Sequence, residues 1–235
     1  MGDRLCADGN GLGCFKRRAH GVRPTINSSL LLPNSNRNRI SIQQRIARQN
    51  MQAYLILANG RILKGKSLGC QGTTVGEVVF ATGMVGFEET LTDPSYYGQI
   101  ITQTYPLIGN YGMNSEDKES GKIWAKGYIV REACTTPSNF RSEETLNTFL
   151  KENGIIGIEG IDTRSLTCIL RESGVMNGAI TTEFDPENEP EKLAALMPII
   201  KAYAVTGAVD AVTCTEPQCF APTAGVAEGE EPLHI

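Results

Sequence analysis

The sequence predicts an α/β domain in which strands come first and helices follow. Three observations lead to this fold class. β-branched runs fill the first eighty residues after Met51, strand and helix patterns alternate further along, and both chain ends lack a period. This order is typical of a layered mixed sheet with helices on one side. With 235 residues, 40% of them hydrophobic, the chain is long enough to bury a core.

The first part of this body is predicted to be mostly sheet. Residues 53–69 hold two strand-compatible runs on either side of Asn59-Gly60, a dipeptide that strongly favours a tight hairpin. Further strands are expected in the β-branched segments 76–83 and 99–105. Residues 122–130, KIWAKGYIV, alternate in polarity and are also predicted to be a strand.

Helical patterns begin after these strands. Residues 142–154, SEETLNTFLKENG, predict a helix with Ser142 as its N-cap, an acidic first turn and Gly154 at its end. Two short runs, 155–158 and 178–182, are expected to be strands that separate this helix from the next ones.

Two more helices are predicted in the last third of the body. Residues 162–174 begin with Asp162 or Thr163 as a cap, place leucine and isoleucine on one face, and stop at Gly174. Residues 190–205 form the last helix, with a proline in its first turn, where the missing N–H does no harm.

Two segments are predicted to lie outside the body at 51–213. Residues 1–50 contain nine Lys and Arg against two Asp, whereas the whole chain carries a net charge of −4. We interpret them as a basic, disordered leader. A start site placed upstream of a true start at Met51 is favoured over an organelle transit peptide. Residues 214–235 show no period and are interpreted as a truncated linker or a non-native tail.

Composition excludes several function classes. No apolar run approaches the eighteen or so residues that span a bilayer, so the sequence predicts a soluble protein. Seven cysteines without a CxxC pair argue against disulfides and zinc, and favour a reducing, cytoplasmic location. The basic leader has a single aromatic residue, Phe15, so nucleic-acid binding is not expected.

The body offers little catalytic chemistry. The two histidines, His20 and His234, both fall outside it, so no general base of this kind is available. Cys70 sits in LGCQG, which fails the Gly-x-Cys-x-Gly spacing of thiol amidotransferases, and a structural cysteine is the better interpretation. Adjacent Glu88 and Glu89 would point to opposite faces of a strand and form no acid–base pair.

One segment is unusual. Residues 91–114, LTDPSYYGQIITQTYPLIGNYGMN, join a tight turn, a β-branched run and a loop that carries two asparagines and two tyrosines. Asp93, which precedes Pro94, is expected to brace the turn through its own backbone. A lone serine in such a turn is usually only a turn residue, so the pattern alone assigns it no role.

Six motifs in order give the body a resemblance. GEVVF, LTDPSY, TYP-x-IGN-x-G, SNFR, IDTR-x-LT and LRE-x-G occur with family-like spacing. Over residues 51–213 the chain closely resembles the N-terminal domain of the carbamoyl-phosphate synthase small chain. The resemblance implies a single domain with a three-layer β/β/α, swivelling-type fold.

The family also implies a function. Its small chain hydrolyses L-glutamine and passes ammonia to a large chain, which uses ATP, Mg and bicarbonate to make carbamoyl phosphate for arginine and pyrimidine synthesis. The family's glutaminase residues, a cysteine and a His–Glu pair, lie in a second domain, and this sequence has no Gly-x-Cys-x-Gly-x-Gln and no His-Pro-Glu. We therefore expect no catalytic residue, metal or cofactor in this chain, and no activity of the chain alone.

One residue carries over from the family. Ser95 of LTDPSY is similar to the serine that reaches across the domain boundary to the bound glutamine. The resemblance thus assigns Ser95 to glutamine binding. The alternative is a non-catalytic interaction module that docks on the large chain.

Overall fold

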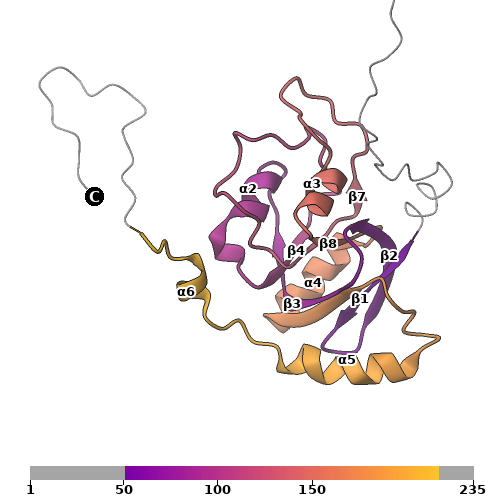
Figure 1. Ribbon diagram of the computed structural model, residues 1–235. Helices are drawn as coiled ribbons and strands as arrows, with labels where there is room; N and C mark the ends of the chain where they lie inside the picture. The colour runs from indigo at the N-terminus through magenta and orange to yellow at the C-terminus, as the bar shows by residue number, and fades with distance from the viewer. Residues whose placement is uncertain (1–50, 217–235) are drawn as a thin grey trace, which may run out of the picture. The chain divides into compact units, whose positions relative to one another are not determined.

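The strands of the protein close into a barrel in the computed structural model, which describes residues 51–216 (Figure 1). The barrel order within that part of the chain is β1-β2-β8-β6-β4-β3-β9. The strands are β1 (Gln52–Leu57), β2 (Ile62–Gly69), β3 (Thr73–Ala81), β4 (Gln99–Gln103), β6 (Gly127–Ile129), β8 (Ile156–Glu159) and β9 (Met176–Thr181). Two short strands, β5 (Leu107–Ile108) and β7 (Glu132–Ala133), pair separately.

Five helices connect and follow the strands within residues 51–216. They are α2 (Phe87–Thr92), α3 (Leu146–Glu152), α4 (Thr163–Ser173), α5 (Pro190–Ala202) and α6 (Ala208–Val212), with a 3₁₀ turn η1 (Pro94–Tyr96). In Figure 1, α2 and α3 lie above the strands and α5 lies below them. The fold is therefore mixed α/β, as predicted, whereas closure of the barrel was not predicted. The three-layer arrangement stays a prediction.

Local signals specified several elements correctly. β1 and β2 form the predicted antiparallel hairpin, and Gly60 takes the positive φ of 87° that its turn requires. α4 begins where Asp162 accepts a hydrogen bond from the Ser165 N–H at 3.0 Å, and it ends at Gly174, as predicted. The predicted strands at 76–83, 99–105, 155–158 and 178–182 and the predicted helix at 190–205 are confirmed by β3, β4, β8, β9 and α5.

Alternation along the strands builds three buried clusters. Leu55 and Ile100 pack with the side chains of α4, whereas their neighbours Ile56 and Ile101 belong to different clusters. Ile56 lies under α5 and Ile101 packs toward α2 and α3. Because successive residues of a strand face opposite sides, one strand supplies both the inside and the outside of the barrel.

Two predicted boundaries were wrong. The strand expected at 122–130 is limited to β6, because residues 122–126 belong to a loop that contacts α2. The helix expected from Ser142 begins only at Leu146, where the Thr145 side chain accepts the Thr148 N–H. The reason is that the backbone of Glu143 and Glu144 is already paired with Met113. Tertiary pairing has overridden an N-cap signal here.

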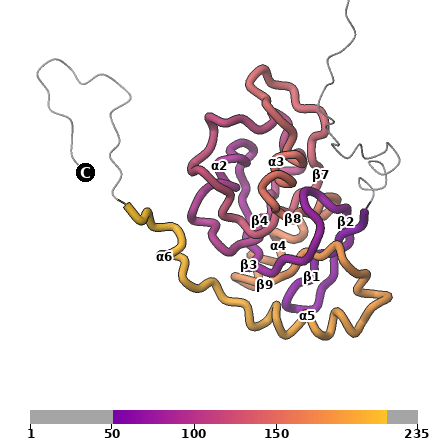
Figure 2. Tube along the Cα trace, in the orientation of Figure 1, coloured from indigo at the N-terminus to yellow at the C-terminus, as the bar shows by residue number. Residues whose placement is uncertain are grey.

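The predicted leader at 1–50 and all but the first three residues of the predicted tail at 214–235 lie outside the described residues. Among residues 51–216, no helix is long and apolar enough to cross a membrane. The tube in Figure 2 follows the described chain from β1, through the loops around α2 and α3, to α5 and α6.

Candidate functional site: the turn that carries Ser95

The Ser95 turn is fixed by its own backbone. The Asp93 carboxylate accepts the Ser95 N–H at 2.8 Å, and the Asp93 carbonyl accepts the Tyr96 N–H at 3.1 Å. Pro94, whose φ is preset, occupies the first position of η1. Asp93 therefore braces the turn, as predicted.

The side chain of Ser95 is left free by this arrangement. Ser95 is exposed, and its hydroxyl makes no hydrogen bond to any residue that the structure describes. A hydroxyl can donate one hydrogen bond and accept two, so Ser95 retains its whole capacity for a partner.

Ser95 borders a groove beside the last part of the described chain. The groove, about 390 Å³ in volume, lies between the Ser95 turn and the segment from Val205 to Val212. Its lining is Glu77, Pro94, Ser95, Tyr97, Gln99, Val205, Ala208, Val209 and Val212. The free hydroxyl thus stands at the edge of a mostly apolar surface, next to α6 and the segment that leads into it.

The helix before the turn depends on a distant tyrosine. Gly86, the N-cap of α2, has no side chain to satisfy the first N–H groups of the helix. The Tyr111 hydroxyl accepts the Gly86 N–H at 2.8 Å and the Phe87 N–H at 3.4 Å, and its ring stacks on Phe87 with centroids 4.1 Å apart. Tyr111, in the loop that follows β5, therefore stabilises the first turn of the helix that leads to Ser95.

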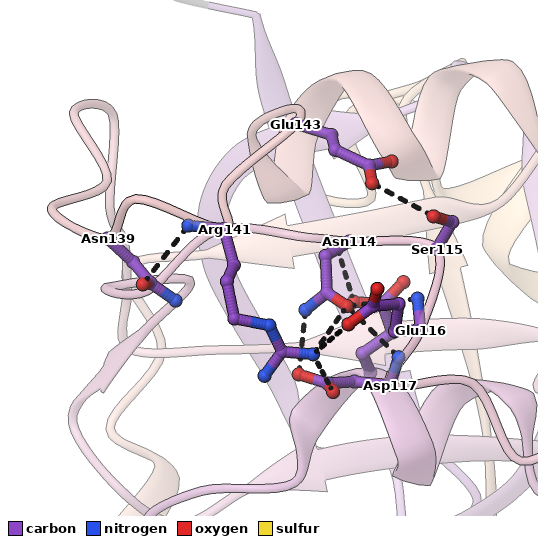
Figure 3. A network of polar contacts seen from close by, with 8 residues as sticks. Asn114, Ser115, Glu116, Asp117, Asn139, Arg141 and Glu143 are labelled. Carbon is purple, nitrogen blue, oxygen red and sulfur yellow. Dashed lines mark hydrogen bonds and ion pairs between the residues drawn. The ribbon is translucent and has the colours of Figure 1, made fainter. Parts of the chain in front are cut away.

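A polar network joins the loop that begins at Asn114 to the SNFR segment at residues 138–141 (Figure 3). Asn114 lies between the two: its side-chain amide donates to Asp117, and its side-chain oxygen accepts from Arg141. Arg141 also pairs with Asp117 at 2.7 Å and with Glu116 at 3.0 Å. Hydrogen bonds from the Asn114 amide and the Arg141 guanidinium hold the pKa of Asp117 below its usual value.

Glu88 places a carboxyl group inside the protein. It lies in α2, not in a strand as predicted, and its residue is completely buried. Oε2 accepts the Asn114 N–H at 2.8 Å, while Oε1 has no partner among the described residues. Burial raises the pKa of Glu88, and the Asn114 hydrogen bond opposes this only in part.

Cys70 has no histidine beside it among the described residues. The Cys70 thiol donates to the Lys151 carbonyl oxygen at 3.3 Å, and no histidine occurs anywhere in 51–216 to activate it. A larger cavity of about 730 Å³, lined in part by Cys134, Asn147 and Lys151, does not include Ser95. Within 51–216, no group of His, Cys, Asp and Glu residues could hold a metal ion.

These features define a mixed α/β barrel domain that presents a braced polar turn beside a groove. The family model described as carbamoyl-phosphate synthase small chain, CPSase domain, matches residues 55–180. The chain belongs to this family of carbamoyl-phosphate synthase small chains.

Similar proteins of known name belong to the same family. The carbamoyl phosphate synthase small chain of Syntrophotalea carbinolica is 51% identical over 170 residues, which are 71% of this chain and 44% of that protein. The small chain of Clostridium perfringens is 55% identical over 146 residues, or 62% of this chain and 42% of that one. The chain thus spans less than half the length of these relatives.

The chain also shows a low similarity to a solved structure of a different protein. An aminopeptidase from Aneurinibacillus sp. strain AM-1 is similar over 55% of this chain and 30% of its own, at 17% identity and a TM-score of 0.34. Similarity at this level carries no argument about fold or function.

Proposed function

We propose that this chain supplies the CPSase domain of a glutamine-dependent carbamoyl-phosphate synthase small chain and contributes Ser95 to glutamine binding. In this proposal a glutaminase domain hydrolyses L-glutamine and passes ammonia to a large chain in a cytoplasmic heterodimer. The large chain holds ATP and Mg and makes carbamoyl phosphate from bicarbonate for arginine and pyrimidine synthesis. The three-layer β/β/α, swivelling-type arrangement belongs to the same proposal.

The observation that carries the proposal is the free hydroxyl of Ser95 on a braced turn. The Asp93 hydrogen bond fixes the backbone, yet the Ser95 side chain is exposed and has no partner among the described residues. A small polar group held in this way can reach into a neighbouring pocket without filling it. The groove beside it, lined by Val205 and Val209, offers a surface on which a second domain can pack.

The hydroxyl has one modest role in the proposed chemistry. It can donate to a carbonyl or carboxylate oxygen of glutamine, or accept from its amide. If its hydrogen bond strengthens as the amide carbon becomes tetrahedral, the contribution falls on turnover more than on apparent affinity. No step of bond cleavage is assigned to this chain.

The test joins this chain to the glutaminase domain of a relative in one chimeric protein. Ser95→Ala in the chimera is expected to reduce glutamine-dependent kcat/KM by an amount equivalent to about 0.5–1.5 kcal/mol. In the chain alone the same change is expected to alter the free energy of unfolding by less than about 0.5 kcal/mol, because Ser95 is exposed. A destabilised chain with unchanged chimera kinetics would make Ser95 a structural turn residue and remove it from the site.

A second candidate function is docking on the large chain without catalysis. One observation favours it: Phe140 is 97% exposed, although its neighbours Asn139 and Arg141 are held by hydrogen bonds. Exposed aromatic residues on rigid turns are frequent anchors of protein interfaces. Binding of the chain to a large chain, weakened by Phe140→Ala and accompanied by unchanged large-chain activity, would favour this candidate.

A further inference from the structure

Residues 114–124, here called the clamp loop, contact both ends of α2. The helix has only six residues and is too short to be stable by itself. The clamp loop runs alongside it and makes hydrogen bonds to its first and its last turn. The position of the helix is therefore set by contacts from outside it.

At the first turn the contact is buried. The Asn114 N–H donates to the Glu88 carboxylate at 2.8 Å, and both residues are inaccessible to solvent. Asn114 is itself tied to Asp117 and Arg141 in the network of Figure 3. This end of the clamp loop is thus anchored to the body of the domain.

At the last turn three contacts converge on two residues of α2. The Glu119 N–H donates to the Thr92 hydroxyl at 3.0 Å, and the Ser120 hydroxyl donates to the Thr92 carbonyl at 2.6 Å. The Trp124 N–H donates to the Leu91 carbonyl at 3.2 Å, and its indole N–H donates to the Ser120 hydroxyl at 2.8 Å. The Leu91 and Thr92 carbonyls lie in the last turn of the helix, where carbonyl groups have no hydrogen-bond partner within the helix.

The clamped end leads directly into the candidate site. Thr92 is the last residue of α2, and the next residue, Asp93, holds the Ser95 N–H. Any tilt of the helix end is passed to the turn within three residues. Because a displacement of about 1 Å can change a rate by about a hundredfold, such a support has functional weight.

We propose that the clamp loop positions Ser95, with Thr92 and Ser120 as positioning residues that act through the Asp93–Ser95 turn. The inference rests on the proposed function, in which Ser95 contacts glutamine. It goes beyond it by naming the residues that place the hydroxyl. Neither Thr92 nor Ser120 lines the groove beside Ser95, so neither is assigned a contact with substrate.

The first experiment measures amide hydrogen exchange by NMR in the full chain. Thr92→Val removes the acceptor of the Glu119 N–H and the hydroxyl's own donation to the Glu88 carbonyl, and it nearly keeps the side-chain shape. The matched control is Thr90→Val in the same helix, because the Thr90 hydroxyl donates only to the carbonyl of Gly86, the N-cap of α2, and makes no hydrogen bond to the clamp loop. Exchange of the Ser95, Tyr96 and Tyr97 amides is expected to accelerate by about tenfold in T92V and to change little in T90V.

Other amides separate local from global effects. Faster exchange at Glu119 shows that the clamp contact has been broken, and the Phe149 amide in α3 reports general destabilisation. Unchanged exchange at Ser95, Tyr96 and Tyr97 while Glu119 accelerates would overturn the proposal. Equal acceleration at every amide, Phe149 included, would overturn it too, because Thr92 would then be merely structural.

Ser120→Ala provides a second, milder variant. Ser120 is half-buried, and loss of its hydroxyl removes the hydrogen bonds to the Thr92 and Lys122 carbonyls and from the Trp124 indole. We expect the same selective acceleration at the Ser95 turn. If T92V does not fold, S120A alone decides the question by the same comparison with Phe149.

The second experiment uses the chimera with a glutaminase domain. Thr92→Val is expected to lower glutamine-dependent kcat/KM in the chimera but to have no further effect when Ser95→Ala is already present, since the two act through one hydroxyl. Additive losses would overturn the positioning role. If Ser95→Ala has no effect, the proposed function fails, while the exchange experiment, which needs no glutamine, still decides whether the loop positions the turn.

Discussion

Asp93 fixes the backbone of Ser95 without touching its side chain: the carboxylate accepts the Ser95 N–H at 2.8 Å, and the hydroxyl stays exposed. The bond closes a turn over three residues and needs no distant partner. A braced backbone with a free side chain separates the folding role of LTDPSY from any binding role.

Replacement of the brace should destabilise the chain in a graded way. Asp93→Ala removes the acceptor and is expected to lower the free energy of unfolding by about 1 kcal/mol, as loss of a cap does. Asp93→Asn keeps an oxygen acceptor and should have a smaller effect. Urea unfolding measures both variants. Equal stability of wild type and D93A would mean that Pro94 fixes the turn without help.

Removal of the Tyr111 hydroxyl should destabilise the chain even when the ring is kept. Tyr111→Phe keeps the stack on Phe87 but leaves the Gly86 and Phe87 N–H groups without their acceptor. We expect a loss of about 1–2 kcal/mol, because two donors at a helix start lose a partner. Tyr105→Phe is the control, since its half-buried hydroxyl has no hydrogen bond to the described residues. Similar thermal melts of Y111F and Y105F would contradict this account.

Glu88 should make stability depend on pH. Because burial raises its pKa in the folded chain, the protonated form favours folding. This contribution is complete below the ordinary pKa of 4.5 and is lost as the pH rises through the raised value. Stability from Glu88 therefore falls with rising pH in that window.

Glu88→Gln tests whether the stability contributed by Glu88 falls as the pH rises. The amide stays neutral, and its oxygen can still accept the Asn114 N–H, so the variant is expected to lose less stability than wild type between pH 4.5 and 8. Urea unfolding at several pH values measures the difference. Glu89→Gln, a half-buried neighbour in the same helix, serves as the control. Parallel pH profiles for wild type and E88Q would show that Glu88 has an ordinary pKa.

The chain alone should not hydrolyse glutamine. Residues 51–216 contain no histidine, and the Cys70 thiol donates to a carbonyl oxygen instead of facing a base. Incubation with glutamine should release glutamate at the blank rate. Turnover above the blank that disappears in Cys70→Ser would show that this cysteine is a nucleophile after all.

Sequence patterns predicted the elements that local chemistry specifies. Asn59-Gly60 indicates the β1–β2 hairpin, and Asp162 and Gly174 mark the ends of α4, because each acts within a few residues. α2 was missed because its first N–H groups depend on Tyr111, far along the chain, and not on a cap of its own. Tertiary contacts of this kind leave no local signal.

Some features of the candidate site could likewise be predicted from the local sequence, and others could not. The turn and the bracing role of Asp93 follow from DPS itself. The assignment of Ser95 came from family resemblance, because one serine in a turn has no distinguishing pattern. The clamp contacts at Thr92 could not be predicted, because they join segments about 27 residues apart through a loop without a period.

The closed strand order has a consequence for how the chain behaves apart from any partner. β9 pairs with both β1 and β3, so every strand of the described barrel has two neighbours. Unpaired backbone at a sheet edge is the usual template on which chains add to one another and aggregate. In the barrel the backbone of each strand is paired with neighbouring strands on both sides. The barrel can therefore expose apolar side chains beside Ser95 without presenting an edge strand of its own, whereas the short β5–β7 pair keeps open edges.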